Sequence, residues 1–167
     1  MKLLIGIAGL MALAVAVVAI VGALLPRAHQ ASRSVVIAAP PEDVYRTVAD
    51  FANAPAWRSD AKRVEILGRV NGRLRFKEHG AHGAVTYEVT EEKPPQMLTT
   101  EIIDRNLGYS GSWTYTFAPE GPGTRVTITE KGDVSNVIFR FMARFVFGYT
   151  RSMDAFLASM AEHFRRR

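Results

Sequence analysis

The pattern of hydrophobic and polar positions changes three times along the chain, and each part predicts a different kind of element. Residues 3–25 contain no charged residue, which predicts one apolar helix. Residues 34–130 hold short alternating runs that predict strands, with two short helices near residues 41–51 and 56–57. From Ser135 onward, large apolar residues recur every three or four positions, which predicts one long amphipathic helix with Ser135 as its N-cap and Gly148 as the place of a bend.

The strand-like runs are spaced as in a series of hairpins. Asn71-Gly72 separates two of them, and this dipeptide is the strongest two-residue hairpin signal. The predicted strands are residues 34–38, 63–70, 73–78, 84–91, 97–104, 112–117 and 124–130. Consecutive hairpins give an antiparallel sheet, and a terminal helix with one apolar stripe must pack on one face of it. The sequence therefore predicts an α+β domain in which a curved sheet of about seven strands grips a long C-terminal helix, with a cavity between them.

The apolar N-terminal segment has the length of a membrane span. As a helix, residues 3–25 extend about 35 Å at roughly 1.5 Å per residue, enough to cross a bilayer core about 30 Å thick. A cleaved secretory signal is the alternative, because Val21-Gly22-Ala23 is similar to a cleavage site, but signals have shorter apolar regions. We therefore expect an uncleaved transmembrane anchor over residues 1–26, in contact with the lipid bilayer through residues 3–25, and one domain over residues 27–167.

The charges that flank this segment are nearly balanced, with Lys2 on one side and Arg27 and Arg33 on the other. Because a single N-terminal anchor most often leaves its N-terminus inside the cell, we expect a single-pass membrane protein whose domain lies outside the cytoplasm. Alanine recurs at spacings of four and three within the segment, and such a stripe of small residues would permit a weak dimer. Alanine is also a common apolar filler.

Composition removes several classes of function. The sequence has no cysteine, which excludes disulfide frameworks, cysteine nucleophiles and thiolate metal sites. The 22% of charged residues exclude a wholly membrane-embedded protein, and a formal net charge of +5 does not indicate a nucleic-acid partner. The spacing His79-Gly80-Ala81-His82 is similar to a pair of metal ligands, but no third ligand is nearby. We expect a polar turn there, and no metal or other cofactor.

A motif near the first predicted strand resembles a known family. The stretch SVVIAAPPEDVY over residues 34–45, followed by VADF over residues 48–51 and by Trp57, is similar to the opening of the START-like, polyketide cyclase/dehydrase superfamily (SRPBCC). Tyr45 stands where that motif usually has its first tryptophan. The resemblance implies the helix-grip fold, and it extends to members with an N-terminal membrane span. Members of the superfamily bind lipids, sterols, hormones or polyketide intermediates, and some catalyse while many only carry.

Strand alternation and helical spacing predict which side chains face the space between sheet and helix. They are mostly apolar or aromatic, with a few hydroxyls, as expected for a hydrophobic ligand oriented by one or two hydrogen bonds. The predicted lining is Leu74, Phe76, Val85, Tyr87, Val89, Leu98, Thr100, Ile102, Trp113, Tyr115, Phe117, Val126, Ile128, Phe141, Phe145 and Tyr149. Alternatively, the same side chains simply fill the core.

Glu78 and Glu130 continue the inward registers of their strands. Together with Tyr87 and Tyr115 they are the candidate acids and bases, because burial raises the pKa of a carboxyl group. The alternative is that both glutamates lie at strand ends in water. An enzymatic role requires at least two of the four side chains to converge in one pocket.

Three arginines, Arg140, Arg144 and Arg151, lie on the predicted long helix. A row of charges on an amphipathic helix usually forms its solvated face. Contact with anionic lipid is the alternative.

Three functions fit these features. The leading hypothesis is a membrane-anchored binding or carrier protein for a hydrophobic small molecule such as a lipid, isoprenoid or polyketide-like compound. The second is a cyclase- or dehydratase-type enzyme that uses acids and bases in the same cavity. The third is a non-catalytic interaction domain whose core is closed, with Trp113, Phe145 and Tyr149 filling the space under the helix.

Overall fold

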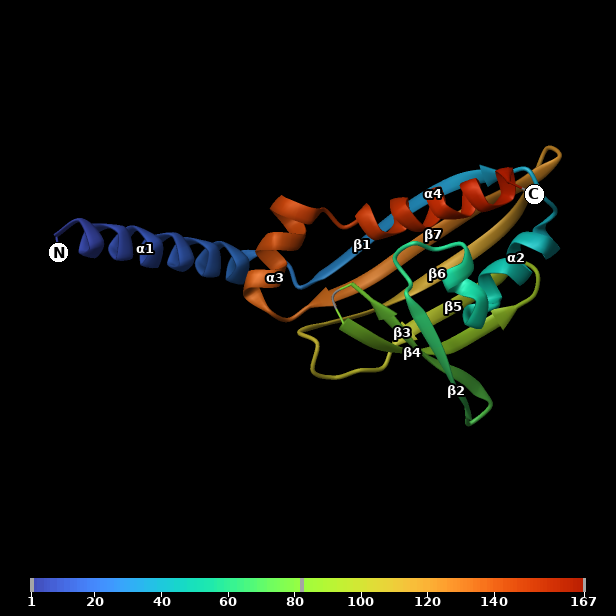
Figure 1. Ribbon diagram of the computed structural model, residues 1–167, viewed down its shortest axis with the longest axis horizontal. Coiled ribbons are helices and arrows are strands. Elements are labelled where there is room, and N and C mark those ends of the chain that lie inside the picture. The colour runs from blue at the N-terminus through green and yellow to red at the C-terminus, as the bar shows by residue number, and fades with distance from the viewer. Residues whose placement is uncertain (1, 82, 167) are drawn as a thin grey trace.

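Figure 1 shows a computed structural model of the chain, in which residues 2–81 and 83–166 are described. The helices are α1 (Lys2–Leu24), α2 (Pro41–Ala49), the 3-10 helix η1 (Phe51–Ala56), α3 (Val137–Met142), the π-helical turn η2 (Ala143–Phe147) and α4 (Arg151–Arg165). The strands are β1 (Ala28–Ile37), β2 (Arg63–Val70), β3 (Arg73–Gly80), β4 (Gly83–Lys93), β5 (Met97–Ile102), β6 (Tyr109–Glu120) and β7 (Gly123–Val134). Helix α1 projects away from the domain that the other elements form.

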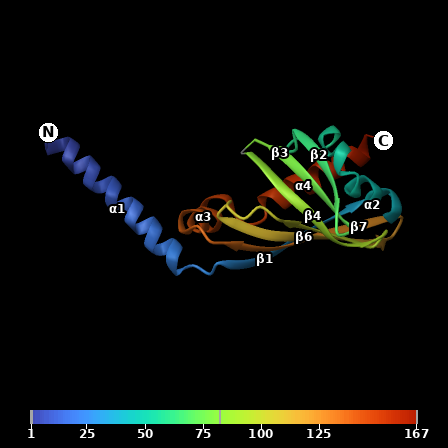
Figure 2. The same ribbon diagram turned by 90° about the horizontal axis from the view of Figure 1, so that it is seen from below.

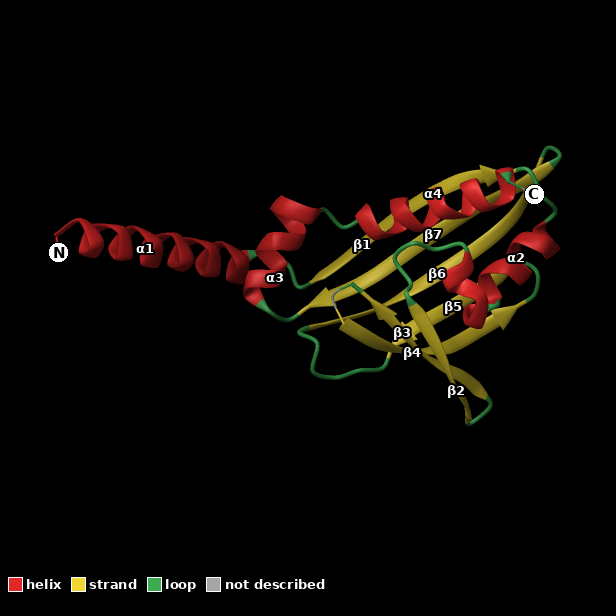
Figure 3. Cartoon of the chain, in the orientation of Figure 1, coloured by secondary structure: helices red, strands yellow, loops and turns green. Residues whose placement is uncertain are grey.

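The seven strands form one antiparallel sheet in the order β1-β7-β6-β5-β4-β3-β2. The turn between β2 and β3 is made by Asn71 and Gly72, whose φ angles of 52° and 81° fit the two-residue hairpin that the sequence predicts. Figure 3 shows α4 lying along the sheet, with α2 near one end of it. The α+β helix-grip architecture, with one apolar helix before it, is confirmed.

The first strand begins six residues earlier than predicted, at Ala28 instead of Ser34. Its first half, residues 28–33, is polar and pairs with β7 from Ala28 opposite Asp133 to Arg33 opposite Ile128. An edge strand with one face in water needs no apolar run, because the backbone ladder and polar cross-strand pairs hold it. The hydrophobic pattern therefore reveals only the second half of this strand.

The C-terminal helix is interrupted, so the prediction of one continuous helix from Ser135 is wrong. Asn136 caps α3, since its side chain accepts hydrogen bonds from the backbone N–H groups of Ile138 and Phe139. The helix then widens into the π-helical turn η2 and stops at Gly148, whose φ of 73° and ψ of 157° are incompatible with a helix. As a result, α3 and η2 form a separate segment between the sheet and α4.

Apolar residues from the sheet, α2 and α4 form the core. Its fully buried members include Ile37, Val44, Leu98, Val126, Ile128, Met153 and Met160. On α4, Met153, Phe156, Leu157 and Met160 recur at helical spacing and face the sheet. This core holds α2 and α4 at fixed places on one side of the sheet.

Helix α1 has the length and composition of a membrane span. Residues Ile5–Leu24 have a mean hydropathy of 2.7, and only 6% of the most apolar stretch is buried against the domain. The core helix of a soluble protein would be mostly buried, and α1 is not. A secretory signal shares its length and composition, so these features fit both alternatives considered above.

The C-terminal end of α1 is fixed to α3 by Arg140. This side chain is buried, and its guanidinium donates hydrogen bonds to the carbonyls of Gly22 and Leu25 on one side and Val134 and Ser135 on the other. The prediction that Arg140 belongs to a solvated helix face is therefore wrong. The cation satisfies carbonyls that a helix end leaves unpaired.

Replacement of Arg140 by methionine is expected to loosen α1 from α3, because buried carbonyls then lose a charged donor at a cost of about 2 kcal/mol. Trypsin should cleave the full chain in detergent faster after Arg27, which lies between the end of α1 at Leu24 and the start of β1 at Ala28. Arg144→Met is the matched control, since Arg144 is exposed one turn further on. Equal cleavage rates for the two variants would show that Arg140 does not hold this junction.

Glu88 on β4 makes a pH-dependent contribution to the stability of the fold. The hydrogen bond from Arg75 lowers its pKa below the usual value, against the effect of burial, and a hydrogen bond from Arg73 adds to this. A carboxyl group with a lowered folded-state pKa stabilises above about pH 4.3, and this stabilisation is lost as the pH falls through the folded-state value. The difference in unfolding free energy between wild type and Glu88→Gln should shrink between pH 7 and 3 in urea titrations. A constant difference contradicts this.

Candidate functional site

A cavity of about 470 Å³ lies between the sheet and the helices. Its volume falls in the range of about 300–1,000 Å³ that is typical of small-molecule sites. The sheet contributes Phe76, Glu78, Tyr87, Thr100, Ile102, residues 109–113, Tyr115, Glu130 and Val134, and β1 contributes His29. The helices and the segment before β2 contribute Val48, Phe51, Ala54, Trp57, Arg58, Asp60, Phe139, Met142, Ala143, Phe147, Gly148, Tyr149, Ser152 and Phe156. This cavity contradicts the closed core that the third hypothesis requires.

Aromatic rings form much of the cavity wall. Phe51 of η1 stacks on Phe76 with ring centroids 4.1 Å apart, and Phe76 stacks on Tyr87 at 5.2 Å. On the α4 side, Phe156 lies edge-on to Trp57 at 5.1 Å and to Trp113 at 6.0 Å. Stacked and edge-on pairs are the favoured arrangements of aromatic side chains, and they give the wall a rigid apolar surface.

A buried ion pair interrupts this wall. Arg58 donates two parallel hydrogen bonds of 2.8 Å to Glu78, and it also donates to Asp60. Its guanidinium lies 4.9 Å from the Phe156 ring centre, which adds a cation–π contact. Burial alone would lower the pKa of Arg58, but the hydrogen bond from Arg58 to Asp60 and the charge of Glu78 raise it above the usual value. Arg58 is therefore a permanent cation, whose charge Glu78 and Asp60 offset.

A second polar cluster surrounds Glu130. One of its carboxylate oxygens lies 2.9 Å from Nε2 of His29, and the other accepts a 2.7 Å hydrogen bond from the indole N–H of Trp113. Tyr149 stacks on the His29 ring with centroids 4.0 Å apart. His29 also lies against β7, since a Cβ at Gly132 would be 2.2 Å from its ring. The cluster thus joins β1, β6 and β7 to the segment that precedes α4.

Two tyrosines add hydroxyl groups to the wall. Burial raises the pKa of Tyr87 well above its usual value, and the negative charge of Glu78 adds to the shift. Burial also raises the pKa of Tyr115, although a hydrogen bond with Thr100 acts in the opposite direction. Both phenols are therefore neutral at physiological pH and serve as hydrogen-bonding groups, not as bases.

The predicted site residues fall into two groups. On the cavity wall the structure brings together Phe76, Glu78, Tyr87, Thr100, Ile102, Trp113, Tyr115, Glu130 and Tyr149. Outside the cavity lining lie Leu74, Val85, Val89, Leu98, Phe117, Val126, Ile128, Phe141 and Phe145. Both glutamate side chains are less than one-fifth exposed, so they do not lie at strand ends in water.

Two physical reasons separate seven of these nine residues, all except Leu74 and Val85, from the cavity. Val89, Leu98, Phe117, Val126 and Ile128 are on the inward face as predicted, but they are in the part of the sheet that α2 and α4 cover, so they pack in the core. Phe145 is 58% exposed, and its ring contacts Phe141. The π-helical turn η2 widens the helix here, and the face that carries these two residues is turned outward.

Sequence reasoning missed the residues that the segment before β2 and the polar half of β1 supply. Arg58 and Asp60 come from a connection without periodicity, and His29 comes from a stretch with no strand-like pattern. One signal was available, since a carboxylate on an inward strand register, as at Glu78, needs a cationic or donor partner. Phe139, Met142 and Phe147 were not predicted as cavity residues, because the prediction assumed an uninterrupted helix.

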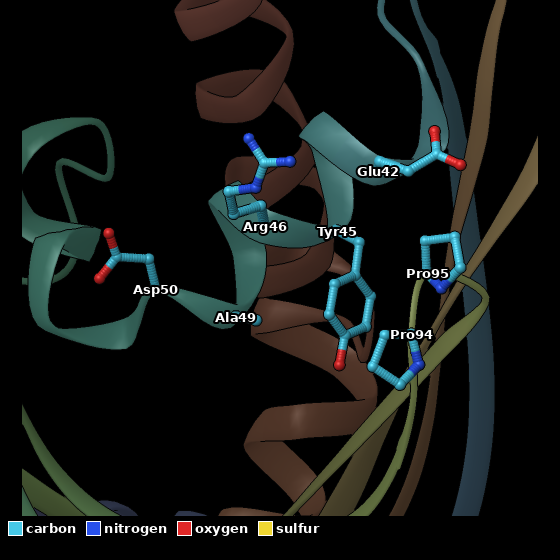
Figure 4. Close-up of a pocket in the computed structure, with 7 residues that line it drawn as sticks. All are labelled: Glu42, Tyr45, Arg46, Ala49, Asp50, Pro94 and Pro95. Carbon is cyan, nitrogen blue, oxygen red and sulfur yellow. The ribbon is translucent and has the colours of Figure 1, made fainter.

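A second hollow lies on the outer side of α2 and has a different character. Figure 4 shows Tyr45 beside Pro94 and Pro95, with the side chains of Glu42, Arg46 and Asp50 spread apart around the groove. This groove is open to solvent and holds about 520 Å³. Charged side chains that point apart do not converge on a ligand, so the cavity between the sheet and the helices is the better candidate site.

Metal-ligating side chains are not grouped in the part of the chain that the structure describes. Within residues 2–81 and 83–166, no three His, Asp or Glu side chains are arranged to hold a metal ion. The two-histidine spacing cannot be followed, because His82 lies outside the described residues. Its partner His79 contacts Glu65 and Arg63.

Solved structures share this fold at low sequence identity. The Zhui aromatase/cyclase from Streptomyces sp. R1128 is 17% identical, with a TM-score of 0.69 over 84% of this chain and 95% of its own. A START superfamily protein from Mycobacterium smegmatis is also 17% identical, with a TM-score of 0.63 over 83% and 98%. The di-domain ARO/CYC BexL is 14% identical, with a TM-score of 0.71 over 87% of this chain, which spans about half (52%) of that protein.

At these identities the likeness shows the fold alone, and no curated protein matches the sequence. A family model, in contrast, identifies the family. The model described as "Polyketide cyclase / dehydrase and lipid transport" matches residues 28–165, from the start of β1 to the last turn of α4. This match covers nearly the whole chain outside α1, and the chain therefore belongs to the polyketide cyclase/dehydrase and lipid transport family.

Proposed function

We propose that the chain is a membrane-anchored carrier for a hydrophobic small molecule, held in the cavity between sheet and helices. The observation that carries the proposal is a 470 Å³ cavity with a largely aromatic wall, in which Arg58, Glu78 and Glu130 are already paired within the protein. The ligand is lipid-, isoprenoid- or polyketide-like, and α1 anchors the domain in a bilayer where such molecules concentrate. The domain is outside the cytoplasm in this proposal.

The wall chemistry supports a neutral, ring-bearing ligand with one or two hydroxyl or carbonyl groups. Stacked phenyl rings such as Phe51 and Phe76 match flat ring systems. The phenol groups of Tyr87 and Tyr115 can donate to a carbonyl or accept from a hydroxyl. Arg58 is already neutralised by two carboxylates, so the cavity offers little to a free anion.

Both glutamate carboxylates already have hydrogen-bond partners in the protein, which supports a carrier function over acid–base catalysis. Each oxygen of Glu78 accepts from Arg58, and the two oxygens of Glu130 contact His29 and Trp113. A general base needs an oxygen within hydrogen-bond reach of the proton that it removes. Each of these carboxylate oxygens already has one partner, so only its remaining lone pair is open to a substrate proton.

Tryptophan fluorescence tests the proposal in the full chain. Trp57 and Trp113 are the only two tryptophans, and both line the cavity. In dodecylmaltoside micelles, emodin, a tricyclic phenolic ketone, is expected to quench them saturably at one molecule per chain. Palmitic acid as competitor distinguishes a ring-selective cavity from one that also takes acyl chains.

Two substitutions on α4 separate binding in the cavity from partition into the micelle. Ser152 is an exposed residue that also lines the cavity, one turn before Phe156, so Ser152→Phe should narrow the cavity opening and weaken emodin binding at least about tenfold. Ala158→Phe is the matched control, since Ala158 is exposed and outside the cavity. Non-saturable quenching that is identical in wild type and both variants refutes the proposal.

A second candidate function is a cyclase- or dehydratase-type enzyme. The observation that favours it is that Glu78, Glu130, Tyr87 and Tyr115 all line one cavity. Such an enzyme must exchange a proton next to a ketone carbonyl. Deuterium uptake into a 1,3-diketone such as benzoylacetone, followed by NMR, should then be faster with wild type than with Glu130→Gln. Equal rates for wild type, variant and protein-free buffer leave carriage as the function.

A further inference from the structure

The segment α3–η2 exposes a group of large apolar side chains. Phe145, Val146 and Phe147 are each more than half exposed, at 58%, 56% and 52%, and Phe139 is 48% exposed. With Ile138 at 37%, these five residues are called here the α3 patch. Soluble proteins rarely leave so many large apolar side chains of one segment in water, and a partner of matching chemistry is the usual reason for such a patch.

The patch is held beside the end of α1. A Cβ at Gly22 would lie 2.1 Å from the carbonyl oxygen of Val137, so the two helices touch through their backbones. Arg140 binds the carbonyls of Gly22 and Leu25 from the same side. Figures 1 and 2 both show α3 at the end of the domain where α1 leaves it. The position of the patch is therefore set relative to α1.

The position of the α3 patch indicates which partner covers it. In the proposed function, on which this step rests, α1 spans a bilayer and ends at Leu24. The α3 patch then lies at the level of the membrane surface, on the segment that contacts the C-terminal end of α1, where Leu24 is 81% exposed. Aromatic side chains favour this boundary, and the exposed Arg144 between them can reach lipid headgroups.

The same segment also forms one part of the cavity wall. Phe139 and Phe147 belong to the patch and line the cavity, together with Met142 and Ala143. Gly148 then separates the segment from α4, which packs on the sheet. Phe139 and Phe147 therefore form the wall at this end while about half of each residue stays exposed.

We infer that α3–η2 is embedded in the membrane interface and opens the cavity toward the lipid phase, so that the ligand passes between bilayer and cavity without crossing water. The bilayer is the partner of the α3 patch. A lipophilic molecule that enters this way does not expose its apolar surface to water during transfer.

Single-cysteine labelling of the full chain tests this inference, because the sequence contains no cysteine to interfere. Phe145→Cys carries an NBD fluorophore in nanodiscs of phosphatidylcholine and phosphatidylglycerol, and 5-doxyl phosphatidylcholine is the quencher. We expect strong quenching at position 145 and none at Ala158→Cys, which is on exposed α4 surface. Equal quenching at the two positions overturns the inference.

Leu13→Cys separates this inference from the proposal on which it rests. Leu13 is 61% exposed near the middle of α1, and deep 12-doxyl lipid should quench it. Quenching at position 13 without quenching at position 145 overturns the inference and leaves the anchor in place. If position 13 is not quenched either, the anchor itself fails. A blue-shifted, unquenched signal at position 145 that is lost at one chain per disc shows contact with a second copy, and also overturns the inference.

A transfer experiment tests the route of the ligand. Phe145 and Val146 do not line the cavity, so Phe145→Asp/Val146→Asp should leave emodin binding in micelles unchanged. Uptake of emodin from vesicles of the same lipids should become at least about tenfold slower, because charges there oppose contact with the apolar phase. Phe145→Leu/Val146→Leu is the matched control with wild-type uptake. An unchanged rate in the aspartate variant overturns the inference.

Discussion

Replacement of Arg58 by alanine is expected to lower the free energy of unfolding by about 3 kcal/mol, because it leaves a buried carboxylate without its cation. The Arg58 side chain is 11% exposed and that of Glu78 is 17% exposed, so water can compensate little of the loss. The cation–π contact with Phe156 is lost as well. The effect is measured by urea unfolding of the full chain in micelles.

Two comparisons show whether the pairing itself causes the effect. Arg63→Ala removes an arginine that is 62% exposed and pairs with Glu65, and it should cost less than about 1 kcal/mol. The double variant Arg58→Met/Glu78→Met should recover most of the loss, because an apolar pair of similar volume can replace a buried ion pair. A double variant no more stable than Arg58→Ala would contradict this account of the pair.

Phe156→Ala is expected to cost about 3–5 kcal/mol, which is the range for removing a fully buried phenyl ring. Phe156 is 3% exposed, and its ring contacts Trp57, Trp113 and Tyr115. Removing it also enlarges the cavity, so emodin should bind less tightly and the tryptophan emission should shift to the red. Thermal unfolding and emission spectra of the full chain measure both effects.

Phe156→Leu is the control for volume, and it should cost less than half as much. Phe164→Ala serves as a comparison outside the cavity wall, because Phe164 is only partly buried against the core. It should leave the emission unchanged. If Phe156→Ala shifts neither the unfolding temperature nor the emission, the aromatic cluster does not organise the cavity.

The fold follows from periodicity because its signals are local. Alternation along residues 84–91, the Asn71-Gly72 turn and the three- to four-residue spacing on α4 each depend on neighbours in the sequence. The family opening at residues 34–45 agrees with this reading. Two features went beyond these signals: the polar half of β1, which depends on pairing with β7, and the full break at Gly148, where the sequence indicates only a bend.

The candidate site was less predictable, because long-range partners decide it. The inward register of Glu78 was visible in the sequence, but Arg58, twenty positions earlier in an irregular connection, was not. Register also cannot separate the cavity from the core. Val89 and Tyr87 share one face of β4, yet Val89 packs in the core and Tyr87 lines the cavity. Coverage of each end of the sheet by helices decides which of these occurs.

The buried Arg140 shows that a local pattern of charges also does not reveal long-range partners. On a continuous helix its position fits a solvated row with Arg144 and Arg151, and a charge row usually indicates solvent. The carbonyls at the end of α1 and at the end of β7 instead surround its guanidinium. Because α1 lies more than a hundred positions earlier, no local pattern indicates this contact.

Native mass spectrometry of the full chain, released from micelles after incubation with emodin, tests the central claim most directly. The proposed cavity predicts a complex of one chain with one emodin molecule. Ser152→Phe should lose the complex and Ala158→Phe should keep it, since only Ser152 lines the cavity. Bare protein at every emodin concentration, or equal adducts on all three proteins, would contradict the claim that this cavity binds a hydrophobic ligand.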